Sequence, residues 1–475
     1  MTFNSIEFAA LLGAVLALHW TVAPRWRNAV ILAGSYVFYG WWDVRLLSLL
    51  VFSTAVDFAV ARRLGATSAD DRTTRQRLIG VSLVANLGVL VGFKYAGFFV
   101  ASLTSAMTSL GLSANPTLLQ VVLPIGISFY TFQSMAYTID VYRGRIRPTR
   151  DPVLFATYIA YFPQLVAGPI ERAERLLPQM QDPGRRFPTG PALERSLSLI
   201  GLGLVQKVVL ADTVAPIVND VFDRPGEHSW VALLAGLVGF SVQIYGDFAG
   251  YTNIARGVSS LFGIQLMTNF TEPYLSRDIT EFWRRWHISL STWLRDYLYI
   301  PLGGNRGGGR RTVRNLMITM LLGGLWHGAS TTFLVWGGLH GLFLAIHRGV
   351  RGNRPSPPDD APVRVADIPR ITLTFGLVAL AWTFFRADTV GGALTVLNRI
   401  ATLQSGRSSV ADVVTVAVLA GAMVALDLLM RRQSARPDRP LITGPVRTGV
   451  VGGVAVVLVL VAAGGTPEPF VYFQF

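Results

Sequence analysis

The chain has no cysteine among its 475 residues. Disulfides, thiolate metal sites, iron–sulfur clusters, a cysteine nucleophile and palmitoylation are therefore excluded. Lysine is nearly absent too, since it occurs only at Lys94 and Lys207 and arginine supplies the other basic side chains. An HExxH motif is also missing, and the spacing of the six histidines does not match a two-ligand helix face, so we predict no metal cofactor.

Charge of either sign is scarce. Charged residues make up 15% of the chain, whereas a soluble protein of this length carries about a quarter. Apolar runs of membrane-spanning length recur along the whole sequence, which indicates a polytopic membrane protein. The excess of 42 basic over 28 acidic residues would suggest nucleic acid in a soluble protein. Here the arginines lie between apolar runs, where membrane lipids attract them, so we predict no nucleic-acid partner.

The apolar runs predict an all-α integral membrane fold. We expect the stretch 230–262, which is longer than a bilayer crossing, to hold one span plus a second helix. Val153 to Ala167 is short and is expected to form a buried or re-entrant segment. The other runs lie at roughly 6–23, 28–41, 44–61, 78–100, 118–142, 196–222, 313–328, 331–347, 371–386, 411–430 and 448–465.

Arginine-rich gaps give the topology. The gaps at 62–77, 143–150, 172–195, 284–314, 348–370 and 431–447 all fit the cytoplasm if the chain crosses about twelve times. Both termini would then lie outside the cytoplasm. No internal repeat is evident, and the polar stretches between runs are short, so we predict one polytopic domain over residues 1–475.

Four of the six histidines fall between residues 287 and 347. His327 lies inside an apolar segment, Leu321 to Ser330, and a polar residue there is a functional candidate because its burial is costly. The alternative is a structural histidine bonded to a neighbouring helix. His287 lies among tryptophans and arginines in Glu281 to Trp293, a pattern typical of an amphipathic helix at the membrane interface. An aromatic anchor with an incidental histidine is the alternative there.

Other polar residues offer weaker candidates. Asn305, Arg306 and Arg310 belong to a loop rich in glycine and arginine that could hold the phosphates of a nucleotide-bearing cofactor. The loop lacks the P-loop pattern, and a basic loop against lipid headgroups is the alternative. Buried acids occur at Asp140, Asp212 and Asp247, where each is expected to satisfy a helix break or an arginine.

Several long stretches resemble the membrane-bound O-acyltransferase (MBOAT) family, in particular its bacterial alginate O-acetylation type; D-alanyl transferases of Gram-positive walls share the architecture less closely. The resemblance implies a ring of about 11–12 transmembrane helices with re-entrant and interfacial helices, and a catalytic core at about 120–348. Its paired polar residues map onto His287 and His327, the second being the catalytic one. His287 would assist catalysis by positioning the acceptor, bonding the thioester carbonyl or relaying a proton. The matching stretches are Gly92–Phe99, Leu123–Gln133, Tyr161–Ile170, Gln243–Gly250, Phe282–Asn305, Leu321–Ser330 and Trp382–Ala387.

The resemblance also implies an activity. A thioester donor, acetyl-CoA or the phosphopantetheine of an acyl-carrier protein, would give up its acyl group with His327 as general base. The acceptor would be a hydroxyl of an extracytoplasmic polysaccharide, reached with an SGNH-type partner at the inner or plasma membrane. The alternatives are a transporter or flippase of lipid-linked sugars, which would work without His327, and a non-catalytic membrane scaffold.

The chain ends in an aromatic tail, Pro469 to Phe475, after the run at 448–465. On composition alone, residues 448–475 predict a helix followed by an aromatic anchor at the membrane interface. The resemblance implies a second role, in which the hydroxyl of Tyr472 carries the acyl group outward. That role requires an extracytoplasmic C-terminus, as the distribution of arginine predicts.

Overall fold

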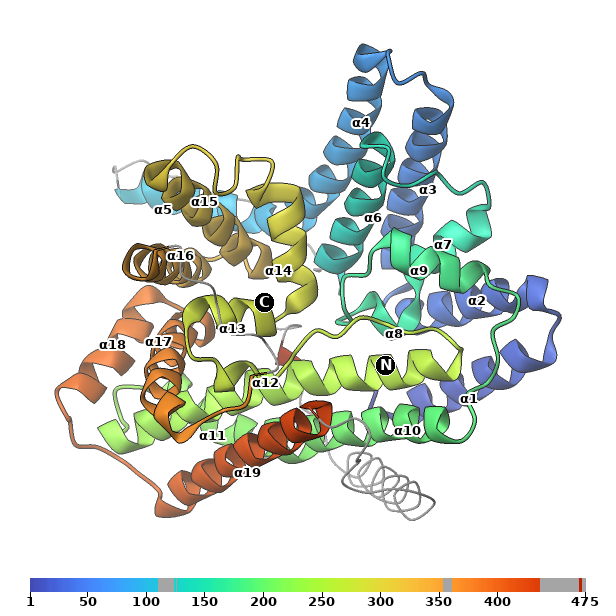
Figure 1. The fold of residues 1–475 in the computed structure, drawn as a ribbon. Coiled ribbons are helices and arrows are strands. Elements are labelled where there is room, and N and C mark those ends of the chain that lie inside the picture. Colours follow the sequence, from blue (N-terminus) through green and yellow to red (C-terminus); the bar gives the residue numbers. More distant parts are fainter. Residues whose placement is uncertain (110–123, 125, 353–360, 436–469, 472–475) are drawn as a thin grey trace. The chain divides into compact units, whose positions relative to one another are not determined.

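The computed structural model describes residues 1–109, 124, 126–352, 361–435 and 470–471. Its regular elements in these ranges are all helical, and the only strand-like pairing there is an isolated bridge between His228 and Arg407. The predicted all-α class is therefore confirmed (Figure 1). The chain forms two compact units, Met1–Ser196 with Ala255–Met267, and Leu197–Ile254 with Thr268–Phe475. The single domain over 1–475 stays a prediction.

The first unit holds the N-terminal helices. Its core packs α2 against α7 and α3 against α4 and α6. The elements are α1 (Ile6–Thr21), η1 (Pro24–Trp26), α2 (Arg27–Gly40), α3 (Val44–Ala66), α4 (Arg72–Leu90), the π-helical turn η2 (Val91–Tyr95), α5 (Ala96–Ser109), α6 (Ile127–Tyr142), α7 (Pro152–Ala160), α8 (Phe162–Leu165) and α9 (Ala173–Gln181).

The second unit holds the C-terminal helices, and α10 and α12 contribute residues to both units. The elements are α10 (Pro191–Leu204), the π-helical η3 (Val205–Ala211), α11 (Asp212–Asp223), α12 (Trp230–Leu261), η4 (Pro273–Leu275), α13 (Ile279–Arg285), α14 (Ile288–Leu294), η5 (Arg295–Tyr299), α15 (Gly309–His327), α16 (Thr331–Arg351), η6 (Val365–Asp367), α17 (Ile368–Arg386), α18 (Val390–Ala401) and α19 (Val410–Ala435).

Many of these helices begin at a side chain that caps the first turn. Asp151 accepts hydrogen bonds from the backbone N–H groups of Val153 and Leu154, and Pro152 occupies the first helical position of α7. Asp278 caps α13 and Ser330 caps α16 in the same way. Such caps satisfy amide donors that have no partner inside the helix. The sequence thus fixes where the two helices that flank the histidines begin.

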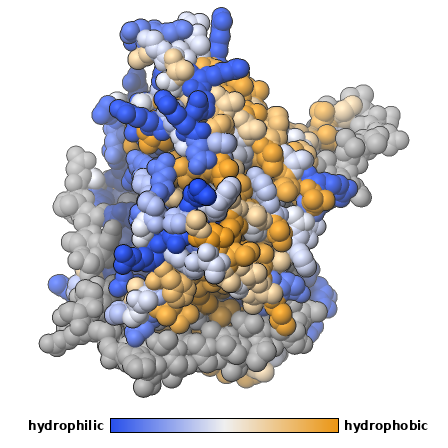
Figure 2. All heavy atoms as spheres, turned by 90° about the vertical axis from the view of Figure 1, so that its right-hand side faces the viewer, coloured by the Kyte–Doolittle hydropathy of each residue, from blue (hydrophilic) through white to orange (hydrophobic). Residues whose placement is uncertain are grey.

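Seven helices in the described ranges are long and apolar enough to cross a membrane. Large hydrophobic side chains are exposed along them, and Figure 2 shows a broad apolar surface bordered by hydrophilic residues. Lipid, rather than water, solvates a surface of this kind. The spans are Val44–Ala66, Arg72–Val100, Pro191–Asp223, Trp230–Leu261, Thr331–Arg351, Val365–Arg386 and Val410–Arg431. The predicted helix at 448–465 lies outside the described residues.

Helix α12 departs from the prediction. The stretch 230–262 was expected to hold a span plus a second helix, but it forms one continuous helix (Figure 1). No proline interrupts it, and its glycines serve close packing: a Cβ atom at Gly250 would lie 2.7 Å from the carbonyl oxygen of Gly203. Burial inside the protein lets a helix exceed the bilayer thickness. The short segment from Val153 to Ala167 forms the buried helices α7 and α8, as predicted.

Candidate active site

His327 is the last residue of α15, and α15 packs closely on α16. Glycine makes this approach possible, because a Cβ atom at Gly324 would lie 2.2 Å from the carbonyl oxygen of Phe333, and one at Gly337 would lie 2.3 Å from that of Met320. His327 is 4% exposed. Two backbones in contact therefore hold the imidazole inside the second unit.

His287 lies where the chain breaks between α13 and α14. It adopts the left-handed backbone region with φ of 43°, which costs a non-glycine residue about 1 kcal/mol or more. The expected interface helix over Glu281 to Trp293 is therefore wrong: two short helices replace it. Trp286 and Arg285 are buried, not spread along a membrane surface, and His287 is fully enclosed.

A buried ion cluster braces this break. Glu281 accepts hydrogen bonds from Arg277 at 2.9 Å and from Arg285 at 3.1 Å. Arg285 also lies 3.6 Å from Glu272 and donates to the carbonyl oxygen of Thr271 at 3.0 Å. Burial alone would raise the pKa of Glu281, but its hydrogen bonds with Arg277 and the nearby Arg285 lower that pKa below its usual value. The carboxylate stays ionised and holds α13 in place.

Asn269 fixes the tautomer of His287. The backbone N–H of Ser289 donates to Asn269 Oδ1 at 3.1 Å, which identifies that atom as the amide oxygen. His287 Nδ1 lies 3.1 Å from the same oxygen and must therefore carry a proton to donate. Complete burial lowers the pKa of His287 to about 3, so the ring is neutral near pH 7. Its Nε2 is left with a lone pair.

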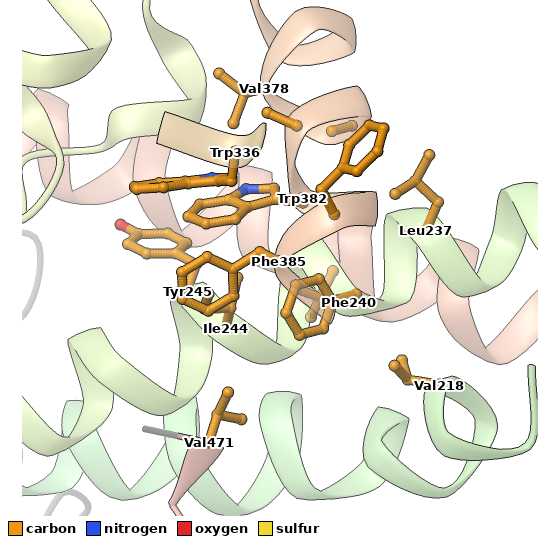
Figure 3. Packing of buried hydrophobic residues seen from close by; sticks show 14 of the residues in the cluster. Val218, Leu237, Phe240, Ile244, Tyr245, Trp336, Val378, Trp382, Phe385 and Val471 are labelled. Carbon is orange, nitrogen blue, oxygen red and sulfur yellow. The ribbon is translucent and has the colours of Figure 1, made fainter. Parts of the chain in front are cut away.

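The two histidines come together, with ring centroids 6.4 Å apart. Aromatic rings surround His327: Trp326 and Trp336 at 5.0 Å and Phe385 at 5.2 Å, each edge to face. Figure 3 shows Trp336 stacked beside Trp382 in this layer. An imidazole in such surroundings is shielded from bulk water, which strengthens every polar interaction that it makes.

A pocket of about 430 Å³ lies among α13, α14, η5, α15 and α16, a volume that suits a small-molecule ligand. Ile288, which follows His287 directly, lines it, and Met320 lines it about two helical turns before His327. Its wall combines two arginines and several hydroxyls with apolar side chains: Thr280, Trp283, Arg284, Ile288, Ser291, Thr292, Leu294, Arg295, Tyr299, Leu316, Thr319, Met320 and Leu344.

The predicted phosphate loop lies next to this pocket. The Tyr299 hydroxyl, on the pocket wall, donates to Asn305 Oδ1 at 2.6 Å, and Arg348 donates to the same oxygen at 3.1 Å. Arg306 and Arg310 are exposed and do not line the pocket. The arginines that do line it are Arg284, from the stretch predicted to form an interface helix, and Arg295, two residues after that stretch.

Two residues of the C-terminal tail reach the same unit. Phe470 and Val471 are buried, and the backbone N–H of Val471 donates to Asp247 Oδ2 at 2.5 Å. Phe470 lies 5.8 Å from the ring of Phe248, which in turn packs 4.7 Å from His287. Figure 3 labels Val471 among the buried cluster. These two residues are thus not a surface anchor, while Tyr472 lies outside the described residues.

The buried acids have basic partners, although arginine holds only one of the three. Lys207 Nζ lies 2.8 Å from both Asp212 and Asp247, whereas Asp140 pairs with Arg145 at 3.3 Å. Lysine was the least expected partner because the chain has only two.

Asn269 and Glu281 were missed from the sequence. The i, i+4 spacing of Glu281 with Arg277 and Arg285 could have indicated the ion cluster. No spacing could have indicated Asn269, because it lies in an irregular segment eighteen positions before His287.

Comparison with known proteins covers the part of the chain that holds the two histidines. The membrane-bound O-acyltransferase family, MBOAT, matches residues 147–385, which include both histidines. The chain is 43% identical over 389 residues to the probable alginate O-acetylase AlgI of Pseudomonas aeruginosa, covering 82% of this chain and 72% of that protein. It is 38% identical to the Pseudomonas putida protein of the same name over 502 aligned positions, covering 100% of both.

A third relative widens the range. The peptidoglycan O-acetyltransferase of Helicobacter pylori is 34% identical, covering 82% of this chain and 76% of that protein. The resemblance inferred from the motifs is confirmed. This chain belongs to the membrane-bound O-acyltransferase family and is a multi-pass membrane O-acyltransferase.

Proposed function

We propose that this protein takes an acetyl group from a cytoplasmic thioester and passes it across the membrane toward a hydroxyl of an extracytoplasmic polysaccharide. The observation that carries the proposal is the pairing of two buried histidines beside a ligand-sized pocket. The relatives named for alginate and peptidoglycan O-acetylation support a polysaccharide acceptor.

His327 acts as the general base. A ring nitrogen takes the proton from the attacking hydroxyl, whose oxygen forms a bond to the thioester carbonyl carbon. The carbon–sulfur bond then breaks, and the thiolate leaves with the proton that the imidazolium returns. Since a thioester is already activated, base catalysis, positioning and stabilisation of the oxyanion are the contributions left to the protein.

His287 orients the attacking hydroxyl. Its Nδ1 proton is directed to Asn269, so Nε2 can accept a hydrogen bond but cannot donate one. This tautomer suits it to hold a hydroxyl group, and does not suit it to stabilise an oxyanion. Its role is therefore positioning of the acyl acceptor next to His327.

The pocket among α13 to α16 holds the donor. Arg284 and Arg295 face it with two charged donors that match phosphate, while Ile288, Leu316 and Met320 offer apolar surface to a pantetheine arm. Acetyl-CoA and a carrier protein share this phosphopantetheine chemistry. Substituting Arg284 with glutamine should raise the KM for the thioester about tenfold, because a charge-assisted hydrogen bond contributes about 1.5–3 kcal/mol.

The test uses sealed vesicles that contain the protein. A thioester carrying labelled acetyl is supplied on the arginine-rich side. Transfer is measured as label that has left the thioester and become attached to the polysaccharide acceptor. We expect His327→Ala to abolish product formation while folded protein persists. A transporter or flippase would still move lipid-linked sugar in this variant, and label transfer at the unmodified rate would reject the catalytic assignment.

Tyr472 serves as a covalent relay in the same proposal, and an SGNH-type partner completes delivery to the sugar. Burial of Phe470 and Val471 one ring away from His287 supports this role, which also requires a C-terminus outside the cytoplasm, as the distribution of arginine predicts. Mass spectrometry of the C-terminal peptide should find an acetyl ester in the wild-type protein and none in Tyr472→Phe. A reporter fused at the C-terminus that reads cytoplasmic would exclude the relay.

A further inference from the structure

His340 is a second fully buried histidine in this unit, and the mechanism above does not use it. It lies on α16 and is 0% exposed. Its ring stacks on Phe282 at 6.0 Å with planes 8° apart, and meets Trp336 at 4.8 Å and Phe343 at 6.0 Å. Such a costly burial of a polar side chain calls for a specific role.

One hydrogen bond defines the state of the His340 ring. Trp283 Nε1 donates to His340 Nδ1 at 3.3 Å. An indole N–H can only donate, so Nδ1 must present a lone pair, and a doubly protonated imidazolium could not accept this bond. His340 is therefore neutral, with its proton on Nε2. It is an acceptor with fixed geometry and not an acid.

Two of the tryptophans that contact His340 lie in different parts of the proposed site. Trp283 lines the pocket assigned to the donor. Trp336 packs edge to face on the ring of His327 at 5.0 Å. His340 thus bonds Trp283, which lines the donor pocket, and contacts Trp336, which packs on His327. It connects the pocket to the proposed base.

We propose that His340 is a positioning residue that fixes Trp283 relative to Trp336, so that the bound thioester lies at the correct distance from His327. The inference rests on the proposed function. Without an acceptor at Nδ1, the indole N–H of the partly buried Trp283 would lose its partner and the ring would turn toward another, which would reshape the pocket. The effect should therefore fall on donor binding first.

The test compares His340→Leu with His340→Asn. Asparagine places an oxygen close to the position of Nδ1, whereas leucine removes the acceptor at similar volume. We expect His340→Leu to raise the KM for the thioester about tenfold, the equivalent of about 1.4 kcal/mol, and His340→Asn to restore it to within about threefold. The pH profile of kcat should not move in either variant, because the ring is neutral throughout.

A double-mutant cycle ties the effect to the bond. Trp283→Phe removes the donor, and adding it to His340→Leu should cost little more, because both changes break the same contact. If His340→Leu yields too little folded protein, Trp283→Phe measures the same loss with the imidazole intact. The matched control is His347→Leu. His347 lies two turns further along the same face of α16, with its ring next to Asp278.

The outcomes separate cleanly. An unchanged KM in His340→Leu, equal damage from asparagine and leucine, or a shifted pH profile would each overturn the positioning role. A similar rise of KM in His347→Leu would mean that the helix, not the ring, matters. None of these results tests the role of His327. The proposed function would instead be rejected by activity that survives His327→Ala.

Discussion

The two units surround their buried polar side chains in different ways. In the first unit, Asp57 on α3 accepts hydrogen bonds from Ser82 and Asn86 on α4 and from Ser134 on α6, with the Asn86 bond at 2.8 Å. In the second unit, His287 and His327 lie among aromatic rings. Three helices meet at the carboxylate, whereas the two histidine rings lie close together and the neighbour of His287, Ile288, lines the pocket.

This contrast separates stability from chemistry. A carboxylate surrounded by donors from neighbouring helices locks those helices together, since removing it leaves several buried groups unsatisfied. In the proposed mechanism the histidines instead serve the reaction, because the surrounding rings exclude water from the imidazoles. Variants in the two units should therefore fail in different ways.

The largest effect should come from His327. Replacing it with alanine removes the proposed base and is expected to lower acyl transfer about 10²–10⁴-fold. The lost imidazole leaves a cavity among the surrounding rings, so the unfolding temperature should fall modestly while most of the protein stays folded at the assay temperature. Transfer and thermal unfolding are measured on the same detergent-solubilised sample, with Asp57→Asn as a variant that keeps both near wild type. A loss of folded protein in step with activity would contradict the account.

Asp57 should show the opposite pattern. Asp57→Leu leaves the donors of Ser82, Asn86 and Ser134 unpaired and is expected to cost about 1–3 kcal/mol of stability. Activity per folded molecule should stay near that of the wild type. The free energy of unfolding and the specific activity of the folded fraction are the two readouts, and Asp57→Asn keeps an acceptor at the same place. Unchanged stability would show that the cluster is not structural.

Within the second unit, a change at Asn269 tests whether the tautomer of His287 matters for the reaction. Asn269→Leu releases the tautomer of His287, so Nε2 carries the proton part of the time and cannot then accept the hydroxyl. We expect kcat to fall about tenfold while the KM for the thioester stays the same. Steady-state kinetics with varied thioester concentration makes the distinction. A pure KM effect would place Asn269 in donor binding.

The smallest effect is a change in pH dependence. Asn269→Asp puts a carboxylate beside His287, which favours the imidazolium and raises the pKa of His287 from about 3. The lone pair on Nε2 is lost below that pKa, so the acidic limb of kcat/KM should move to higher pH while activity at pH 8 changes little. Rates measured between pH 5 and pH 8 test this. Superimposable profiles would mean that His287 does not act as a lone-pair acceptor.

Local patterns predicted much of the fold. Runs of apolar residues located the spans, and the apolar, glycine-flanked setting of His327 indicated a buried polar residue with a task. A catalytic role for His327 was predicted only through the resemblance, since the pattern alone left a structural histidine open. The family was predicted and is confirmed, whereas the roles of His287 and His327 stay predictions.

The break at His287 was not predictable from local sequence. No glycine or proline lies between Glu281 and Trp293 to mark the break, and the periodicity there fits one amphipathic helix. The bend is imposed by contacts distant in sequence, with Asn269 holding the ring and Glu272 drawing in Arg285. For α12 the opposite error was made. Its length suggested two helices, but a helix that is largely buried inside the protein needs no interruption.

The central claim is that His327 performs chemistry on a donor that the pocket holds without its help. The most direct test loads purified His327→Ala with a thioester and measures its dissociation constant and the single-turnover rate on the same sample. We predict a dissociation constant within about threefold of the wild type and a rate lower by about 10²-fold or more. A wild-type rate, or a fall in rate explained entirely by weaker binding, would contradict the account.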